Sequence, residues 1–398
     1  MGYKRGLGKD VHQAALDRVR WVFDNFPRVY VSFSGGKDST CMLHLTALEA
    51  RKRGRKIGCL FVDLEGQYKL TIDHIREMLD LYKDVLEVYW ICLPLNLRNA
   101  VSAYEPQWCC WEPGAKWVRQ PDKVSITDQS YFPFYHYRME FEEFVPAFGE
   151  WYSQGKMTAC LVGIRSDESL NRWRTIASGR KEAVDDHQWT TVVAPNLINV
   201  YPIYDWRTRD DWIYVGKYHL PYNVLYDRMY QAGLTIHQMR ICQPYGDDQR
   251  RGLWLFHIIE PETWGKIVAR VNGANQGALY VQESGDIIGN GKITKPKGHT
   301  WKSFAMLLIE SMPPKTREHY KDKIAVFLHW YQDRGYPNGI PDEGGICDKK
   351  HPSWTRICKA LLRNDYWCRG LSFSQHKSEA YDKYCKLMKK RRAQWKII

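Results

Sequence analysis

The sequence lacks an apolar run near the length of a membrane span, and its first residues lack the charged-then-apolar pattern of an export signal. It also lacks low-complexity tracts and fixed-period repeats. Cysteine is sparse, at 11 of 398 residues, which excludes a disulfide scaffold and leaves the thiols as buried groups, metal ligands or redox groups. We therefore expect an ordered, cytoplasmic protein that does not enter a membrane.

The charge of the chain is strongly positive, with 58 basic and 45 acidic residues and a formal net charge of +13. A positive field attracts polyanions, so nucleic acid is a candidate partner. Basic nucleotide pockets and ordinary surface lysines explain the same charge, and no helix-turn-helix or zinc-finger signature is present. The charge alone leaves nucleic-acid binding open.

The first part of the chain predicts a parallel α/β sheet. Strand-like runs at 28–33, 57–63, 86–93, 159–163 and 198–203 alternate with helical patterns at 10–26, 38–53 and 69–82. Such alternation builds a doubly wound, five-stranded parallel sheet that binds ligands at the carboxyl ends of its strands. Because helical patterns dominate after about residue 215, we predict one domain in residues 1–215 and a mainly helical domain with a basic tail in residues 216–398.

A small, glycine-rich hexapeptide follows the first predicted strand and precedes a helical pattern. Adjacent glycines allow positive φ and close approach of a ligand, the helix N-terminus favours an anion, and the lysine adds a mobile positive charge. We therefore predict a phosphate-binding loop made of Ser34, Gly35, Gly36, Lys37, Asp38 and Ser39. The loop fits neither the Walker A pattern nor G-x-G-x-x-G.

This hexapeptide resembles the PP-loop of the adenine nucleotide alpha-hydrolase superfamily, which includes ATP pyrophosphatases and phosphoadenosine phosphosulfate (PAPS) reductases. The resemblance implies a fold of that superfamily and a loop that grips the outer phosphates of ATP or PAPS. It also implies magnesium, held by Asp38, Asp167 or Glu168. An unliganded strand-to-helix turn is the competing interpretation, but six matching positions in the expected context favour a ligand.

A second motif follows the predicted strand at 159–163 and is expected at the same sheet edge. It resembles the G-x-R-x-x-E-S-x-x-R element of PAPS reductases, and a surface salt-bridge cluster is its competing interpretation. Arginine suits phosphate or sulfate because its planar fork holds two oxygens. We expect Gly163 and Glu168 to bind nucleotide, and we assign catalytic roles to Arg165 and Arg172 together with Lys37 and Asp38.

Asp63 ends the second predicted strand, within a segment similar to the one that lines the adenosine pocket in the family. We expect it to bind nucleotide, although a strand-end acid also forms turns. The long aromatic-rich insert before the strand at 159–163 is expected to form a lid or a wall of the substrate site.

The cysteines give weak metal signals. Cys109 and Cys110 resemble the paired cysteines of cluster-containing family members, but the downstream Cys-x-x-Cys partner is absent. Cys347, Cys358 and Cys368 are weak candidates whose spacing fits no short zinc-finger template. Zinc or an iron–sulfur cluster is therefore not expected.

The C-terminal half resembles the uncharacterised domain appended to PAPS-reductase-like proteins of the immunoglobulin-binding regulator A type. The resemblance implies a ParB-like partner, immunoglobulin-binding regulator B, and a role in regulation, nucleic-acid modification or defence. Three activities stay open: α,β-cleavage of ATP with nucleotidyl transfer, PAPS reduction, and nucleotide sensing without turnover. The glutamate-cysteine-glycine tail segment of family reductases is absent, which places reduction second.

Overall fold

The structure is a computed structural model that describes residues 6, 8–102, 104–177, 181–241, 245–246, 252–275, 293–344, 351–373, 388, 391, 394 and 395. The chain forms two compact units, each discontinuous in sequence. Unit 1 comprises Met1–Asn96, Cys109–Pro244 and Leu255–Arg270, and unit 2 comprises Leu97–Trp108, Tyr245–Trp254 and Val271–Ile398. The domain boundary near residue 215 stays a prediction, because compactness of contacts is a different criterion from independent folding.

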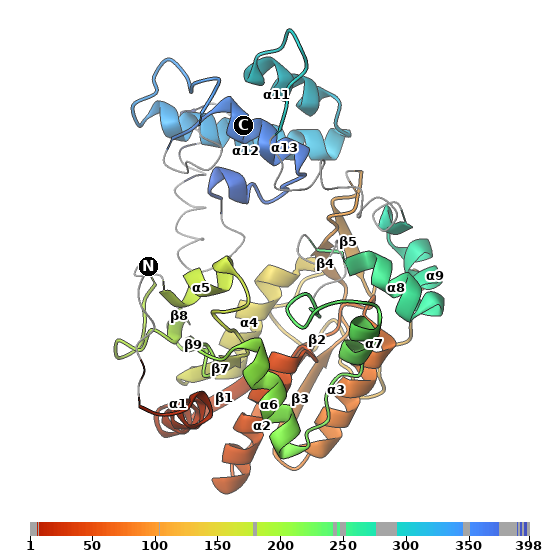
Figure 1. Cartoon of the computed structure of the whole chain (residues 1–398), viewed down its shortest axis with the longest axis vertical. Helices are drawn as coiled ribbons and strands as arrows, with labels where there is room; N and C mark the ends of the chain where they lie inside the picture. The colour runs from red at the N-terminus through yellow and green to blue at the C-terminus, as the bar shows by residue number, and fades with distance from the viewer. Residues whose placement is uncertain are drawn as a thin grey trace. The chain divides into compact units, whose positions relative to one another are not determined.

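Unit 1 is built on a six-stranded sheet in the order β3-β2-β1-β7-β9-β8 (Figure 1). Its strands are β1 (Arg28–Ser32), β2 (Ile57–Val62), β3 (Leu86–Ile91), β7 (Thr158–Val162), β8 (Thr190–Ala194) and β9 (Leu197–Val200). The predicted five-stranded parallel core is confirmed, since β3, β2, β1, β7 and β9 pair in parallel. The sequence analysis missed β8, which pairs antiparallel with β9 at the sheet edge.

Helices cover both faces of this sheet. The chain runs from β1 through β2 to β3 and then returns to β7, so right-handed crossovers place α2 and α3 on one face and α4 on the other. Phe148 and Tyr152 of α4 pack edge-on against Tyr30 of β1. The helices of unit 1 are α1 (Val11–Asn25), α2 (Lys37–Lys52), α3 (Lys69–Leu81), α4 (Phe141–Ser153), α5 (Leu170–Ala177), α6 (Thr208–Tyr218), α7 (Leu225–Gln231) and α9 (Pro261–Arg270).

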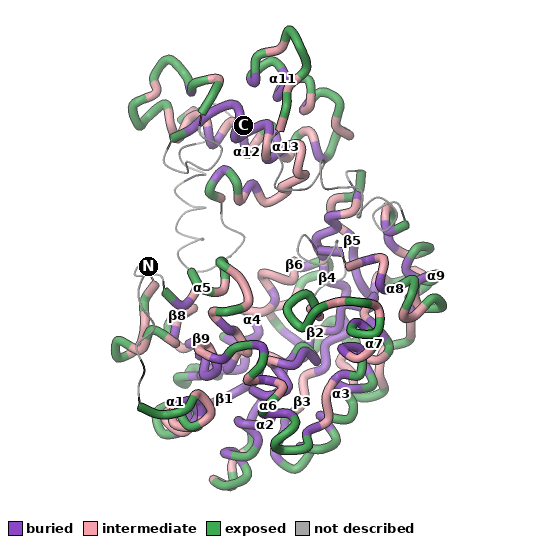
Figure 2. Tube along the Cα trace, viewed as in Figure 1, coloured by how far each residue is buried: buried purple, intermediate pink, exposed green. Residues whose placement is uncertain are grey.

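The starts of these elements follow local chemistry. Asp10 caps α1 by accepting the Gln13 amide at 2.8 Å, and Phe26 leaves the helix with an extended backbone before Pro27. The interior strands read as apolar runs because both faces are covered, and Figure 2 shows the core strands as buried. The predicted bounds of the first three helices and three strands agree with the structure within two residues.

The insert between β3 and α4 carries a second, three-stranded sheet in the order β5-β4-β6. Its strands are β4 (Leu95–Arg98), β5 (Gln107–Cys110) and β6 (Met139–Glu140). Helix α8 (Leu253–Ile259) precedes α9. In the part of the chain that the structure describes, no helix is both long and apolar enough for a membrane crossing.

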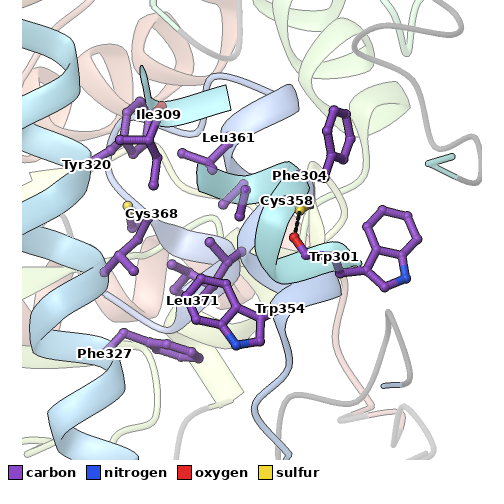
Figure 3. Close-up of a cluster of buried hydrophobic side chains, with 14 of the residues drawn as sticks. Trp301, Phe304, Ile309, Tyr320, Phe327, Trp354, Cys358, Leu361, Cys368 and Leu371 are labelled. Carbon is purple, nitrogen blue, oxygen red and sulfur yellow. Dashed lines mark hydrogen bonds between the residues drawn. The ribbon is translucent and has the colours of Figure 1, made fainter. Parts of the chain in front are cut away.

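The described part of unit 2 is mainly helical, with α11 (Trp301–Glu310), α12 (Pro314–Gln332), α13 (Trp354–Leu362) and a 3-10 turn at Arg369–Leu371. An apolar cluster joins these elements (Figure 3). Ile357 and Cys358 of α13 are fully buried in it, beside Phe327 of α12 and Trp301 of α11. Ser353 caps α13 through the Arg356 amide, and Thr300 caps α11 through the Ser303 amide.

Candidate functional site

The two predicted motifs meet where the order of the parallel strands reverses. β1 and β7 are neighbours, and their last residues, Ser32 and Val162, lie opposite each other. The hexapeptide leaves β1 and the second motif leaves β7, so both emerge at one carboxyl edge. In open α/β sheets this reversal is the place where ligands bind.

The two glycines of the loop have different roles. Gly35 has φ +72°, and a Cβ there would stand 3.0 Å from Ile75 of α3, so the fold itself requires glycine. Gly36 has φ −84°, and its Cβ would make only ordinary 3.5 Å contacts with Ser34 Oγ and Tyr226 Oη. The expectation of positive φ thus holds for Gly35 alone. Gly36 instead keeps a space open between two hydroxyls.

Gly163 allows two backbone segments to pack closely. A Cβ on this residue would stand 2.9 Å from the carbonyl carbon of Asp38 and from the amide nitrogen of Ser39. Only glycine therefore lets the segment after β7 lie directly against the first turn of α2. That approach brings Arg165 to the loop.

A buried cluster of charged side chains underlies the first turn of α2. Lys37 Nζ lies 3.1 Å from Asp38 Oδ2, and Asp38 Oδ1 accepts a hydrogen bond from Arg165 Nε. Arg165 Nε also lies 3.0 Å from Asp211 Oδ2 of α6. Arg165 is 1% exposed and Asp211 is fully buried, so the Arg165 guanidinium faces these carboxyl groups with little access to solvent.

The two carboxyl groups of this cluster have opposite pKa shifts. Burial tends to raise the pKa of Asp38, but the charges of Lys37 and Arg165 outweigh it and lower the pKa to about 2. Burial, followed by the nearby charge of Asp38, raises the pKa of Asp211 well above its usual value. Asp38 therefore favours its charged form, whereas the surroundings of Asp211 favour its protonated form.

Donors for an anion gather around this cluster. Ser34 Oγ lies 3.1 Å from Ser39 Oγ, whose hydroxyl also donates to the Gly36 carbonyl. Among the described residues, the amides of Asp38 and Ser39 have no hydrogen-bond partner, as is usual in the first turn of a helix. Arg165 Nη1 is buried and also lacks a hydrogen-bond partner there. The arrangement suits phosphate oxygens.

The other acids of the second motif lie beside arginines. Asp167 Oδ2 is 3.8 Å from Arg165 Nη1, and Glu168 Oε2 is 3.4 Å from Arg172 Nε. The Arg172 side chain is 42% exposed, so it lies outside the buried cluster. Of the three acids that we expected to hold magnesium, Asp38 and Glu168 are already paired with basic side chains, so these two fit a resident cation poorly. Asp167 lies beyond hydrogen-bond distance of Arg165. The role of each residue in binding or catalysis stays a prediction.

Asp63 and Glu65, at the end of β2, tie down the insert. The Asp63 carboxylate accepts hydrogen bonds from Trp90 Nε1 at 2.8 Å and from Arg119 Nη2. Glu65, with φ +61°, accepts the amide of Trp111 at 2.6 Å and that of Val118 at 3.0 Å. Arg270 of α9 completes this contact at 3.0 Å from Glu65 Oε1. The insert is therefore anchored at the same sheet edge as the loop.

The sequence analysis missed several residues of this site. Asp211 and Glu65 are fully buried acids whose sequence neighbours, Asp210 and Asp63, are acids as well, so local sequence could not show which carboxylate each site uses. Asn223 lies just before α7, and Tyr226 lies in its first turn. Asn223 Nδ2 donates to the Gly35 carbonyl at 3.1 Å, and the Lys37 amide donates to Tyr226 Oη at 3.0 Å.

The described thiols are buried. Burial raises the pKa of Cys358 to about 12, and burial also raises the pKa of Cys110 and Cys368. Cys347 lies outside the described residues. Within the described ranges, no group of three or more histidine, cysteine or acidic side chains is placed to hold a metal ion.

Unit 2 contains an open cavity of about 460 Å³. Lys302, Asp342, Gln332 and Trp354 are among its lining residues, and none of the predicted site residues is. The Asp342 carboxylate is already engaged by the Trp301 and Lys302 amides at 2.9 and 2.8 Å. The phosphate-binding geometry is thus a property of unit 1.

The strand reversal, the glycine loop and the buried lysine and arginine define an α/β nucleotide-binding protein of the PP-loop type. Residues 28–232, more than half of the chain, match the Phosphoadenosine phosphosulfate reductase domain, and the chain belongs to that family. Residues 233–342 match a Domain of unknown function (DUF3440).

Similar proteins cover different parts of this chain. "Uncharacterized protein YbdN" of Escherichia coli K12 is 48% identical over 400 residues, covering 100% of this chain and 98% of that protein. A "Phosphoadenosine 5'-phosphosulfate reductase" of Xylella fastidiosa is 25% identical over 58% of this chain and 81% of its own length. A crystal structure of PAPS reductase from Candida auris covers 57% of this chain and 94% of its own, at 15% identity and a TM-score of 0.28, which is too low to carry an argument.

Proposed function

We propose that this protein binds the triphosphate of ATP in the loop after β1 and cleaves ATP between the α- and β-phosphates. Lys37 and the first amides of α2 hold the β- and γ-phosphates, and a substrate group attacks the α-phosphorus. Pyrophosphate leaves, and the nucleotidyl group is transferred to water or to an acceptor. The proposal belongs to the PP-loop type of chemistry, in which positioning and electrostatic stabilisation supply most of the catalysis.

The observation that carries this proposal is the buried Lys37–Asp38–Arg165–Asp211 cluster beneath unpartnered amides of a helix N-terminus. Lysine and arginine charges are costly to bury, and the arginine keeps one nitrogen without a hydrogen-bond partner among the described residues. A triphosphate brings the oxygens that these donors require. Any magnesium ion arrives with the nucleotide as part of the substrate, because Asp38 and Glu168 are already paired with basic side chains.

The test is Lys37→Ala with Lys52→Ala as a matched control at the far, exposed end of the same helix. We expect Lys37→Ala to abolish pyrophosphate release from ATP and to weaken ATP binding at least tenfold, while Lys52→Ala retains both. Calorimetry measures binding, and mass analysis identifies the products. Unchanged pyrophosphate release in Lys37→Ala would contradict the proposal.

PAPS reduction is the second candidate, and the similarity to enzymes named as PAPS reductases favours keeping it. It requires an accessible nucleophilic thiol, whereas the described cysteines are buried. Thioredoxin-dependent sulfite release from PAPS would place this activity first. Binding of ATP without any cleavage, even with DNA and a partner present, would instead indicate a nucleotide sensor.

The wider role that we propose follows the immunoglobulin-binding regulator A type. In that role the chain acts with a ParB-like protein in regulation, nucleic-acid modification or defence, in the cytoplasm. The net charge of +13 supports contact with nucleic acid. Salt-dependent retention on DNA, measured with and without the partner, tests this role.

A further inference from the structure

Tyr226 occupies a position in the loop that the sequence motifs do not assign. It belongs to α7, 189 residues from Lys37 in sequence, and only 3% of it is exposed. Its hydroxyl oxygen accepts the Lys37 amide at 3.0 Å, which is the first N–H group of α2. A phenol thus reaches the helix N-terminus at the point where a phosphate-binding loop offers its amides.

The segment that carries Tyr226 is held in place from two sides. Asn223 Nδ2 donates to the Gly35 carbonyl at 3.1 Å and to Thr71 Oγ1 of α3 at 2.9 Å. The Trp212 ring of α6 packs edge-on against the Tyr226 ring, with centroids 5.2 Å apart. The hydroxyl is therefore fixed at the loop by its surroundings.

The hydroxyl proton of Tyr226 makes no hydrogen bond within the described part of the chain. The oxygen accepts from Lys37, and no acceptor for its own proton lies among the described residues. Burial, followed by the charge of Asp38, raises the pKa of Tyr226 well above its usual value, so the phenol keeps its proton at neutral pH. A buried donor without an acceptor is costly, and an anion at this point would remove that cost.

The open side of Gly36 shows where such an anion belongs. The position of a Gly36 Cβ would lie 3.5 Å from both Tyr226 Oη and Ser34 Oγ, so two hydroxyls flank the space that glycine keeps free. The unpartnered amide of Asp38 follows Lys37 in the same turn. Hydroxyl and amide donors thus converge over one glycine.

We propose that Tyr226 is a phosphate-binding residue whose hydroxyl accepts the Lys37 amide and donates its own proton to a phosphate oxygen of the bound nucleotide. The inference rests on the proposed function, because it assigns a further ligand contact to the same site. Tyr226 thus links the α2 N-terminus to the phosphate, because the Lys37 amide donates to the phenol and the phenol donates to the phosphate oxygen. The amide N–H polarises the phenol and strengthens it as a donor.

The first test is Tyr226→Phe, which removes the hydroxyl and keeps the ring. Tyr222→Phe is the matched control, since its hydroxyl lies in the same segment but donates to Asp227 Oδ2 at 2.9 Å. We expect Tyr226→Phe to weaken binding of pyrophosphate and of MgATP roughly tenfold to a hundredfold, the range of a hydrogen bond to a charged acceptor. Tyr222→Phe should bind both ligands as the unmodified protein does.

Equal or tighter binding by Tyr226→Phe would overturn the inference, because the hydroxyl would then be neutral or a competitor of phosphate. If the unmodified protein binds neither pyrophosphate nor ATP, the proposed function fails instead. The two failures are thus distinguishable. Unfolding curves without ligand establish that both variants are folded.

A second variant separates donation from simple bracing of the loop. 3-Fluorotyrosine placed at position 226 has a more acidic phenol, which is a better donor and a poorer acceptor than tyrosine. We expect it to bind pyrophosphate more tightly than the unmodified protein, while the same replacement at Tyr222 has no effect. Unchanged or weaker binding would mean that the hydroxyl only accepts the Lys37 amide, and would overturn the inference.

Discussion

The two units bury side chains of different kinds. Unit 1 buries Lys37, Arg165 and Asp211 beneath a helix N-terminus, next to the partly buried Asp38, whereas the cluster of unit 2 around Ile357 is almost entirely apolar. Apolar burial stabilises a fold directly, while a buried ion cluster of good geometry does little more than offset its own desolvation. The apolar cluster of unit 2 therefore stabilises its own fold, whereas the buried charges of unit 1 add little net stability, as expected if they serve the ligand that we propose.

The largest expected effect comes from breaking the charge cluster. Arg165→Met removes the cation that faces both Asp38 and Asp211, and we expect a loss of about 3 kcal/mol in the free energy of unfolding together with loss of pyrophosphate binding. Arg172→Met, at an exposed pair with Glu168, should change stability by less than about 1 kcal/mol. Urea unfolding measures the free energy of unfolding of both variants. Equal losses in the two variants would contradict the expected difference between buried and exposed ion pairs.

The next prediction concerns the apolar cluster of unit 2. Ile357 is fully buried in the unit 2 cluster, so Ile357→Ala should cost about 2–3 kcal/mol in local stability through lost burial and a cavity. Hydrogen exchange of the α13 amides reports this loss. The partly exposed Met306 of α11 supplies the control, Met306→Ala, with little change. Because the phosphate site lies in unit 1, we expect pyrophosphate affinity to stay the same in both variants.

A smaller effect compares the two glycines of the loop. Gly36→Ala should fold normally but bind pyrophosphate about tenfold more weakly, because its methyl group would fill the space between Ser34 and Tyr226. Gly35→Ala should instead lower the free energy of unfolding by about 1–2 kcal/mol, since positive φ strains alanine. Thermal unfolding and calorimetry together separate the two results. A stability loss in Gly36→Ala without a loss of affinity would contradict this division.

The smallest effect concerns pH. The raised pKa of Asp211 means that the folded protein holds a proton that the unfolded chain releases, so stability falls as pH rises above the ordinary carboxyl pKa of 3.8 towards that raised pKa. Asp211→Asn mimics the protonated form and should remove this fall, a relative gain of about 1 kcal/mol at the upper end of the window. Denaturant unfolding at several pH values measures the slope.

The pKa of Asp38 is shifted in the opposite direction, so Asp38 affects stability over a different pH range. Its pKa of about 2 lies below the ordinary aspartate pKa of 3.8, so its contribution to stability is present above pH 3.8 and is lost as pH falls through 2. An identical pH slope in Asp211→Asn and the unmodified protein would show that Asp211 is ionised in the folded state, and the buried pair would then carry a different charge.

The parallel sheet and the loop were predictable because both follow local rules. Apolar runs of strand length alternate with helical patterns, and Ser34 to Ser39 combine glycine, lysine and hydroxyls at a strand-to-helix corner. Edge strand β8, Thr190–Ala194, was missed because it joins the sheet only through its antiparallel pairing with β9 at the edge, outside the alternation of parallel strands and helices. The same limit applies to Tyr226, which approaches Lys37 across 189 residues.

Sequence alone was enough to predict the five parallel strands, the first three helices and the class of loop, since propensity, hydrophobic period and turn chemistry act between neighbours in the chain. Three features required the folded structure: Gly36 leaves room between two hydroxyls, the pKa of Asp211 is raised, and Tyr226 reaches the first amide of α2. Burial and the pairing of charges depend on residues brought together from distant elements. Desolvation and Coulomb energy are therefore set by the fold.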